Sequence, residues 1–498
     1  MTAMSVLAID QGTTGTTCLV IAKDGRVVGR AYREITQHYP APGWVEHDAH
    51  EILERTLDAA REAMANAQQA GANAPVTIGI TNQRETIVLW ERATGRAVHR
   101  AIVWQDRRTA ERCAALAPKA ARIGELTGLV TDPYFSATKL EWLLAQGNNQ
   151  ARADAGELCA GTIDSWLVWH LTGGAVHVTD HTNASRTMLY DLHAKEWSAE
   201  LCLEFNVPVQ LLPTVVPSSG TVGRSTLATL GAELPIMGIA GDQQAALFGQ
   251  GGWSAGDGKN TYGTGAFLLL NTGAHRPPSG SGLLTTIACD ERGHPVYALE
   301  ASIFIAGAAV QWLRDGLGII AASAETEALA AGLSSNDEVY FVPALVGLGA
   351  PDWEPNARGT IVGLTRGTTR AHFARAALEA MAYATRDVLG DMREQGQVPF
   401  DRLRVDGGAS GNNWLMQFQA DVLGVPVDRP DMVETTALGA AGLAGLAAGV
   451  WQSGEEFLAS RQFTRFTPTE TGSASAALAY GGWRRAVRAA LAWARDRD

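Results

Sequence analysis

The sequence predicts an α/β protein with two related domains that face a cleft, and three observations support this. With 498 residues, the chain is longer than one ordinary hydrophobic core can organise. Strand-like and helical segments alternate along it, as they do in α/β folds. A glycine- and threonine-rich turn between two strand-like segments occurs at residues 10–17 and again at residues 259–267. We therefore divide the chain into a first domain, residues 1–250, and a second domain, residues 251–498.

The composition is that of a globular protein and argues against several functional classes. The formal net charge is −12, which disfavours nucleic acid as a main partner. Residues 1–12 lack the basic and apolar regions of a signal peptide, and the longest run of small apolar residues, 437–450, is too short to span a bilayer. The five cysteines are scattered, without paired or metal-binding spacing. We therefore expect a cytoplasmic protein with no nucleic-acid partner and no stable membrane insertion.

The first predicted strand, residues 6–9, runs into the turn DQGTTGTT at residues 10–17. A second strand follows at residues 18–22. Because this turn joins two strands and lacks a Gly-Lys-Ser/Thr sequence, it is not a Walker loop. Its small residues would let backbone N–H groups and hydroxyls approach a phosphate, and Asp10 could hold a magnesium ion through water. A plain hairpin turn is the alternative interpretation.

Polar side chains follow the next predicted strand, residues 76–81. Arg84 and Glu85 place a donor and an acceptor side by side near the end of this strand, which suits a polyhydroxy substrate. A surface ion pair is the alternative. Further along, residues 132–135 predict a turn that displays an aromatic pair. Residues 211–223 are rich in Pro, Ser and Gly, which predicts a connecting loop.

The segment around Asp242 is a candidate for the catalytic centre. A short apolar strand, residues 236–240, ends at Gly241, and Asp242 begins the helical sequence that follows. Open α/β sheets keep their chemistry at such strand-to-helix junctions. Asp242 could therefore accept a proton or hold a hydroxyl. The alternative is that Asp242 only caps the helix, because Asp is a preferred capping residue.

The second half of the chain adds a candidate nucleotide site. Residues 297–305 predict a strand, and residues 308–317 predict a helix. A strand at residues 403–405 ends in the sequence DGGASGN, residues 406–412, before another helix. Glycines ahead of a helix N-terminus allow the backbone to lie against a nucleotide. Residues 437–450 are small and apolar, which predicts a buried helix.

Several long motifs occur in order along the chain: DQGTT (residues 10–14), PGWVEHD (42–48), TNQRET (81–86), GDQQAALFGQ (241–250), YGTG (262–265) and GLGAP (347–351). Together they resemble the FGGY carbohydrate kinases, and among these the enzymes that phosphorylate glycerol. The resemblance extends over nearly the whole chain. It implies two ribonuclease-H-like domains, as in actin, hexokinase and the heat-shock 70 ATPases, with an active-site cleft between them.

The resemblance also implies an activity and a set of site residues. The activity is ATP-dependent phosphorylation of glycerol to sn-glycerol 3-phosphate, with Asp242 as catalytic base and Asp10 as the carboxylate associated with Mg²⁺. The glycerol-binding residues that it implies are Arg84, Glu85, Tyr134, Asp242, Gln243 and Phe267. The nucleotide-binding residues that it implies are Thr13, Thr14, Gly15, Thr264, Gly307, Gln311, Gly408 and Asn412. The expected ligands are glycerol, ATP and Mg²⁺, and the expected assembly is a homodimer or homotetramer.

The sequence departs from the family at two positions, and two other functions compete. Thr17 stands where many relatives carry an arginine, and Asp352 stands where an aromatic residue is usual. One competing function is phosphorylation of another acceptor, such as xylulose, ribulose, gluconate or erythritol, but the TNQRET segment favours glycerol. The other is non-catalytic ATP binding of the actin or heat-shock 70 kind. Such a protein would not need the predicted glycerol-binding side chains.

Overall fold

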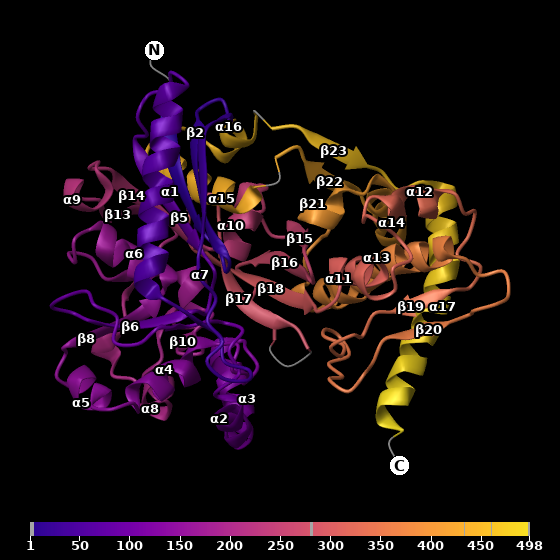
Figure 1. Ribbon diagram of the computed structural model, residues 1–498, viewed down its shortest axis with the longest axis horizontal. Helices are drawn as coiled ribbons and strands as arrows, with labels where there is room; N and C mark the ends of the chain where they lie inside the picture. The colour runs from indigo at the N-terminus through magenta and orange to yellow at the C-terminus, as the bar shows by residue number, and fades with distance from the viewer. Residues whose placement is uncertain (1–3, 279–281, 433, 460, 497–498) are drawn as a thin grey trace.

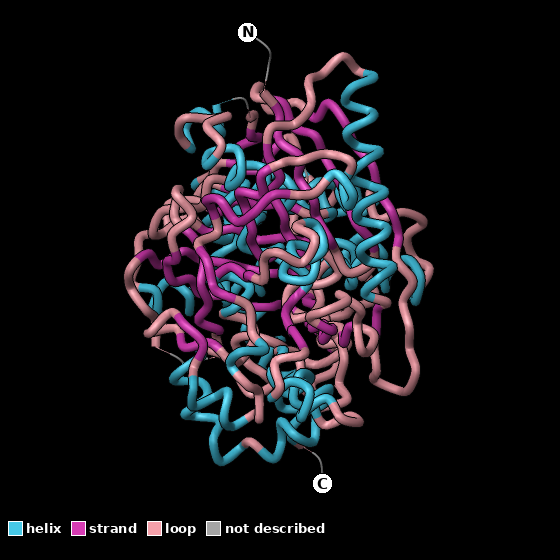
Figure 2. Tube along the Cα trace, turned by 90° about the vertical axis from the view of Figure 1, so that its left-hand side faces the viewer, coloured by secondary structure: helices cyan, strands magenta, loops and turns pink. Residues whose placement is uncertain are grey.

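The computed structural model of the chain describes residues 4–278, 282–432, 434–459 and 461–496. Two large mixed sheets form its centre, one built mainly by the first half of the sequence and the other by the second half (Figure 1). Figure 2 shows the strands gathered through the middle of the molecule, with the two chain ends at opposite extremes of the view. This arrangement agrees with the predicted α/β class.

The first sheet has the strand order β13-β14-β5-β1-β2-β3. Its strands are β1 (Ser5–Gln11), β2 (Gly15–Ala22), β3 (Val27–Glu34), β5 (Thr77–Asn82), β13 (Ser219–Arg224) and β14 (Pro235–Gly241). β1, β5 and β14 are parallel to one another, whereas β2 pairs antiparallel with both β1 and β3. The predicted strand–turn–strand around residues 10–17 is therefore confirmed. The parallel strands are almost completely buried, as expected for strands covered on both faces.

The predicted connecting loop at residues 211–223 was wrong in part, because this segment contains strands β12 (Thr214–Val216) and β13. β12 pairs with β9 (Val178–Asp180), and β13 forms the edge of the first sheet beside β14. Pro, Ser and Gly suggested a loop, but an edge strand tolerates such residues, since one of its sides makes no ladder hydrogen bonds.

The second sheet has the strand order β17-β18-β16-β15-β21-β22-β23. Its strands are β15 (Gly258–Tyr262), β16 (Ala266–Gly273), β17 (Leu284–Cys289), β18 (Pro295–Ile303), β21 (Leu403–Asp406), β22 (Val427–Pro430) and β23 (Phe463–Phe466). β15 pairs antiparallel with β16 and parallel with β21. The second sheet thus repeats the pattern of β1, β2 and β5, which confirms the recurrence of the Gly/Thr turn.

Smaller sheets surround these two. One has the order β4-β7-β6-β8, and two-stranded pairs join β10 to β11 and β19 to β20. Their strands are β4 (Glu46–His47), β6 (Ile87–Glu91), β7 (Ala101–Ile102), β8 (Leu158–Thr162), β10 (Tyr190–Asp191), β11 (Glu196–Trp197), β19 (Tyr340–Val342) and β20 (Thr360–Val362).

The helices cover the faces of the sheets. Those of the first half are α1 (Ala49–Gln69), α2 (Ala110–Ala115), α3 (Ala120–Thr127), α4 (Ser136–Leu144), α5 (Asn149–Asp154), α6 (Ile163–Leu171), α7 (His181–Ala184), α8 (Ala199–Glu204), α9 (Leu227–Leu230) and α10 (Asp242–Gly249). Those of the second half are α11 (Gly307–Gln311), α12 (Glu325–Ala331), α13 (Arg370–Gly396), α14 (Asn413–Leu423), α15 (Thr435–Ala447), α16 (Gly454–Ala459) and α17 (Glu470–Arg495). The predicted helix at residues 308–317 is shorter than expected, because the chain continues from α11 as a π-helix, Trp312–Gly316. Within the described parts of the chain, no helix has both the length and the apolar character needed to cross a membrane.

The small apolar helix predicted at residues 437–450 is α15, and it packs on the first sheet although it comes late in the chain (Figure 1). Small residues allow this close approach. A Cβ atom on Gly79 of β5 would lie only 2.0 Å from the carbonyl oxygen of Ala440. The division of the chain into two domains after residue 250 therefore stays a proposal, because α15, which belongs to the second half of the sequence, packs on the first sheet.

The edge of the second sheet is fixed to the first half of the chain. The Thr285 N–H of β17 donates to the Gly128 carbonyl at 2.9 Å, and the Tyr297 hydroxyl of β18 donates to the Leu192 carbonyl at 3.1 Å. Ile287 and Tyr297 also share a buried apolar cluster with Leu192. These contacts tie β17 and β18 to segments of the first half that follow α3 and β10.

Candidate active site

Three parallel strands of the first sheet bring the predicted catalytic residues together. β1 and β14 flank β5, so Asp10 and Ala240 both pair with Thr81. The chain then leaves β5 toward Arg84 and leaves β14 at Asp242. Parallel strands present their carboxyl ends at the same edge of a sheet. Asp10, Arg84 and Asp242 therefore converge where open α/β sheets bind their ligands.

Asp242 does not occupy the capping position of the helix that follows it. α10 begins at Asp242, its N-cap residue is Gly241, and the described residues provide no side-chain cap. Asp242 Oδ1 accepts a hydrogen bond from the Gln243 backbone N–H at 2.7 Å and lies 3.2 Å from Arg84 Nε. The Asp242 side chain keeps 32% of its surface exposed. Asp242 is therefore not the N-cap residue, although it accepts from one N–H of the first helical turn, and its carboxylate is partly accessible to a ligand.

Asp10 is the second carboxylate at this edge. Burial raises the pKa of its carboxyl to about 7, and the negative charge of Asp242 adds to the increase. A cation nearby would reverse this effect, because positive charge favours the ionised carboxylate. The described residues contain no group of three or more metal-ligating side chains. A metal ion at this edge would therefore take most of its ligands from water or from a bound nucleotide.

Arg84 and Glu85 are buried, so the alternative of a surface ion pair is wrong. Their exposed fractions are 3% and 1%. Glu85 has a left-handed backbone with a φ of 63°, a conformation that costs a residue other than glycine of order 1 kcal/mol or more. Its Oε1 accepts a hydrogen bond from Arg186 Nε at 2.7 Å. Both side chains are thus held in place by the surrounding structure.

Sequence reasoning missed two charged residues that complete this cluster, Arg186 and Glu300. Arg84 donates to both carboxylate oxygens of Glu300, at 2.6 and 2.8 Å, and Arg186 Nη2 lies 3.2 Å from Glu300 Oε1. Burial alone would raise the pKa of Glu300, but the positive charges of Arg186 and Arg84 outweigh it and lower the pKa to about 2. A signal was present in the sequence, since Glu300 interrupts an apolar run, and a charge in a buried strand calls for a partner.

A cavity of about 920 Å³ lies between the two halves of the chain, next to this cluster. The predicted site residues that line it are Tyr134, Thr264 and Phe267. Asp10 and Asp242 lie outside its described lining. The charged cluster adjoins the cavity wall, because the Arg186 guanidinium lies 5.6 Å from the centre of the Tyr134 ring.

Trp104 is a further lining residue that sequence reasoning did not single out. Its indole packs edge-on against Tyr134 with ring centres 5.5 Å apart, and its Nε1 donates to Thr13 Oγ1 at 2.9 Å. Trp104 therefore connects the aromatic wall of the cavity to the turn between β1 and β2. Its place two residues after the short strand β7, ahead of a polar sequence, was the available signal.

Gln243 is oriented by a buried lysine. Lys259 Nζ donates to Gln243 Oε1 at 2.5 Å and to Thr261 Oγ1 at 2.7 Å. Burial lowers the pKa of Lys259, although the charges of Asp406, Asp242 and Glu300 oppose this. Because the amide oxygen of Gln243 accepts from Lys259, the side chain offers its amide N–H groups to a ligand.

A second cavity, of about 600 Å³, lies in the second half of the chain. The predicted nucleotide-binding residues that line it are Thr264, Gly307, Gln311, Gly408 and Asn412. Gly307 has to be small, because a Cβ atom there would lie 2.6 Å from the Gly263 carbonyl oxygen. Asn412 also caps α14 by accepting from the Leu415 N–H at 2.9 Å, so part of its role is structural. Thr264 lines both cavities and marks the point where they meet.

The turn residues Thr13, Thr14 and Gly15 lie outside the described lining of both cavities. Gly15 has a packing reason to be glycine, since a Cβ atom there would lie 2.4 Å from the Arg33 carbonyl oxygen of β3. Only Thr13 contacts the cavity wall, through Trp104. A contact between this turn and a phosphate stays a prediction.

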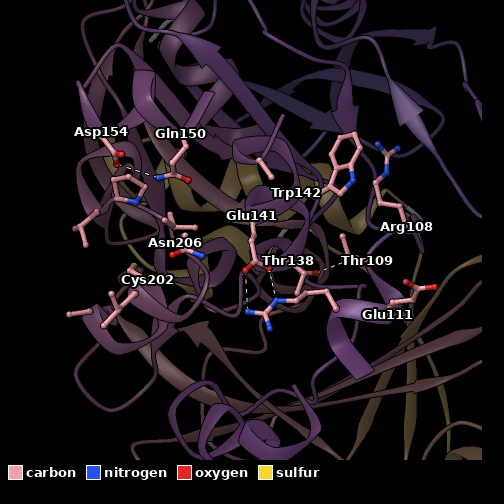
Figure 3. A pocket seen from close by; sticks show the side chains of 17 residues that line it. Arg108, Thr109, Glu111, Thr138, Glu141, Trp142, Gln150, Asp154, Cys202 and Asn206 are labelled. Atoms are coloured by element: carbon pink, nitrogen blue, oxygen red, sulfur yellow. Dashed lines mark hydrogen bonds and ion pairs between the residues drawn. The ribbon is translucent and has the colours of Figure 1, made fainter. Parts of the chain in front are cut away.

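A larger cavity, of about 1070 Å³, lies between α4, α5 and α8 and contains none of the predicted site residues (Figure 3). Several of its charged side chains have partners within the described residues. Arg112 donates to both oxygens of Glu141, at 2.8 and 3.1 Å, and the Gln150 amide donates to Asp154 at 3.2 Å. We therefore assign the chemistry to the edge of the first sheet and to the cavities that meet at Thr264.

Comparison with known proteins shows the family of the chain. Residues 5–249 match the N-terminal domain of the FGGY family of carbohydrate kinases, and residues 258–448 match the C-terminal domain of the same family. The chain belongs to the FGGY family of carbohydrate kinases. The predicted fold class, two α/β domains of the actin-like ATPase kind, is thereby confirmed.

Among the similar proteins are several glycerol kinases. The chain is 54% identical to a glycerol kinase of Symbiobacterium thermophilum, over 99% of both chains. It is 57% identical to one of Aromatoleum aromaticum, over 98% of this chain and 99% of the relative. The solved structure of Plasmodium falciparum glycerol kinase with ADP has a TM-score of 0.93 and 33% identity, covering 98% of this chain and 99% of that one. A Rhodospirillum rubrum xylulose kinase has a TM-score of 0.87 at 24% identity, over 98% and 99% of the two chains, which supports the fold alone.

Proposed function

We propose that the protein transfers the γ-phosphoryl group of ATP to a terminal hydroxyl of glycerol, forming sn-glycerol 3-phosphate and ADP. The observation that carries this proposal is the identity of more than half of the sequence, over nearly the full length, to proteins named glycerol kinase. The geometry supports it, because a carboxylate and an arginine converge at one sheet edge. The cavity lined by Tyr134 and Phe267 also shares Thr264 with the cavity that the predicted nucleotide-binding residues line.

In the proposed reaction, Asp242 acts on the acceptor. Its partly exposed carboxylate orients the terminal hydroxyl and takes its proton. The hydroxyl oxygen forms a bond to the γ-phosphorus while the bond from that phosphorus to the bridging oxygen of ADP breaks. Phosphoryl transfer depends mainly on positioning and charge neutralisation, so Arg84 and Glu85 contribute by holding the other hydroxyls. Tyr134 and Phe267 provide an apolar wall for the carbon backbone.

Asp10 fits the proposed role as the carboxylate associated with Mg²⁺. The raised pKa of its carboxyl reflects burial beside a second negative charge, a condition that a cation relieves. When bound with the nucleotide, magnesium neutralises phosphate charge. Asp10 would hold the hydrated ion, while Asp242 acts on the acceptor hydroxyl.

We expect glycerol to be the preferred acceptor. The test is coupled ADP release with saturating ATP and, side by side, glycerol, dihydroxyacetone, erythritol and xylulose. Glycerol should give the highest kcat/KM, because Arg84, Glu85, Asp242 and Gln243 can pair with all of its hydroxyls. A higher kcat/KM for xylulose or erythritol would indicate another carbohydrate kinase activity. The absence of acceptor-dependent ADP release would support the non-catalytic alternative.

Asp10→Asn should raise the magnesium requirement. The neutral amide is a weaker partner for a hydrated cation, so we expect a higher Mg²⁺ concentration at half-maximal activity and an unchanged KM for glycerol. The variant should remain folded, since Asn removes a buried negative charge that Asp242 repels. Magnesium titrations at saturating substrates, with a melting curve beside each, measure this. A wild-type magnesium dependence would remove Asp10 from the proposed metal site.

Three further predictions accompany this proposal. We expect the protein to work in the cytoplasm and to form a homodimer or homotetramer. We also place the acceptor site mainly in residues 1–250 and the nucleotide site mainly in residues 251–498, and the cavity around Thr264, Gly307 and Gly408 supports this division.

A further inference from the structure

Glu300 occupies an unusual position in the second sheet. It lies in β18, where it pairs with Leu269 of β16 and Leu284 of β17. Its neighbours Leu299 and Ala301 point into the core of the second half. Glu300 points to the opposite face, toward the first half of the chain, and its side chain has no exposed surface. A carboxylate is therefore buried where the two halves meet.

The partner of Glu300 is Arg84, which lies 216 residues earlier. Both Glu300 oxygens accept hydrogen bonds from Arg84, and Gln244 Oε1 accepts a third at 3.3 Å. A guanidinium has five N–H groups, so these contacts use most of them. What remains includes Nε, which lies 3.2 Å from Asp242 Oδ1. The two Nη groups and the Nε of the Arg84 guanidinium thus face different partners, Glu300 and Asp242.

The contacts also show what Glu300 fixes. Arginine binds carboxylates best through two parallel N–H groups, and Glu300 accepts from one such pair, Nη1 and Nη2. The remaining N–H groups, on Nε and on the same side of Nη2, are then those that Arg84 offers to Asp242 and to an acceptor. Without Glu300, only the 3.3 Å contact of Nη1 with Gln244 Oε1 would hold this end, so the guanidinium could turn away from that orientation.

We propose that Glu300 is a positioning residue for the acceptor side of the reaction. From the second sheet, it fixes the orientation of the Arg84 guanidinium, so that the Nε side of Arg84 faces Asp242 and the acceptor hydroxyls. This inference rests on the proposed phosphoryl transfer to glycerol. It adds a residue from the second half of the chain to a site whose other acceptor contacts come mainly from the first half.

The test is Glu300→Gln, which keeps the shape of the side chain but removes its charge. We expect the KM for glycerol to rise about tenfold or more and kcat to fall, because a misplaced guanidinium disturbs both acceptor binding and the base. The KM for ATP should change less than about twofold, since Glu300 does not line the nucleotide cavity. Calorimetric titration with glycerol, without ATP, should show the same loss of affinity.

Glu379→Gln is the matched control. Glu379 is another buried glutamate in an ion pair, with its Oε1 2.7 Å from Arg375 Nε on α13. Its neutralisation should lower the melting temperature as Glu300→Gln does, but leave glycerol affinity unchanged. Glu300→Asp keeps the charge on a shorter side chain and should give an intermediate KM for glycerol. It also keeps the test decisive if Glu300→Gln does not fold.

The outcomes separate this inference from the proposed function. If the wild-type protein prefers another acceptor, the proposed function is wrong, and the same variants are assayed with that acceptor. If the wild type phosphorylates glycerol and folded Glu300→Gln, or Glu300→Asp in its place, has a wild-type KM for glycerol, the positioning role is overturned. An equal rise of KM in Glu379→Gln would overturn it as well, because the effect would then reflect general destabilisation.

Discussion

Asp242→Asn should leave a folded protein that binds ATP and turns over about 10²–10⁴ times more slowly than the wild type. This is the usual contribution of a general base. Asn keeps one acceptor oxygen for the Gln243 N–H and for Arg84 Nε, which lie 2.7 and 3.2 Å from Asp242 Oδ1. It cannot take a proton at neutral pH. The measurement is kcat with saturating glycerol and ATP, beside a melting curve.

Two other variants complete this experiment. Asp48→Asn is the matched control, because Asp48 is a true helix cap that accepts from the His50 and Glu51 N–H groups at the start of α1. Asn caps as well as Asp, so this variant should keep both stability and turnover. Asp242→Ala should also weaken glycerol binding, since it removes a hydroxyl partner. Near-normal turnover by folded Asp242→Asn would exclude this carboxylate from the chemistry.

Arg84→Ala should lower kcat/KM for glycerol by about 10²-fold or more, with a much smaller effect on ATP binding. The substitution removes a rigid donor fork from the acceptor site. The structure adds a second effect, because Glu300 then keeps only its contact with Arg186. Breaking a buried ion pair by removing one partner costs about 3–5 kcal/mol. We therefore expect a large fall in melting temperature together with the kinetic defect.

A double variant separates the two effects of Arg84. Arg84→Met with Glu300→Gln removes both charges of the pair, and replacing both partners of a buried pair is often nearly neutral for stability. The melting temperature should recover relative to Arg84→Ala, whereas the KM for glycerol should stay high. If glycerol affinity recovers together with stability, Arg84 acts only as a structural residue. An unchanged KM for glycerol in Arg84→Ala itself would lead to the same conclusion.

The candidate site shows which residues a linear pattern can indicate. Asp10 and Asp242 each end a short apolar strand, so their places at the sheet edge follow from local sequence. Arg84 and Glu85 were predicted in the same way, but the sequence did not predict that they are buried. Two adjacent polar residues form the same sequence pattern whether they lie on the surface or in the core. Only packing from other elements distinguishes the two environments.

Glu300, Arg186 and Trp104 show the limit of such patterns. Each owes its place to contacts with segments far away in the chain, such as the pairing of Glu300 with Arg84. The edge strand β13 and the docking of α15 on the first sheet also depend on contacts with distant segments of the chain. The local sequence of an edge strand or of a docked helix does not indicate which element packs beside it.

By itself, the sequence determined the α/β class, the two Gly/Thr turns and the strand-end positions of Asp10 and Asp242. These features depend on periodicity and turn chemistry over a few residues, where local preferences act directly. Tertiary structure alone decided which charges are buried together and how Arg84 is oriented. The reason is physical: a buried charge is stable only beside its partner. The partner of Arg84 is supplied by the packing of the second sheet against the first.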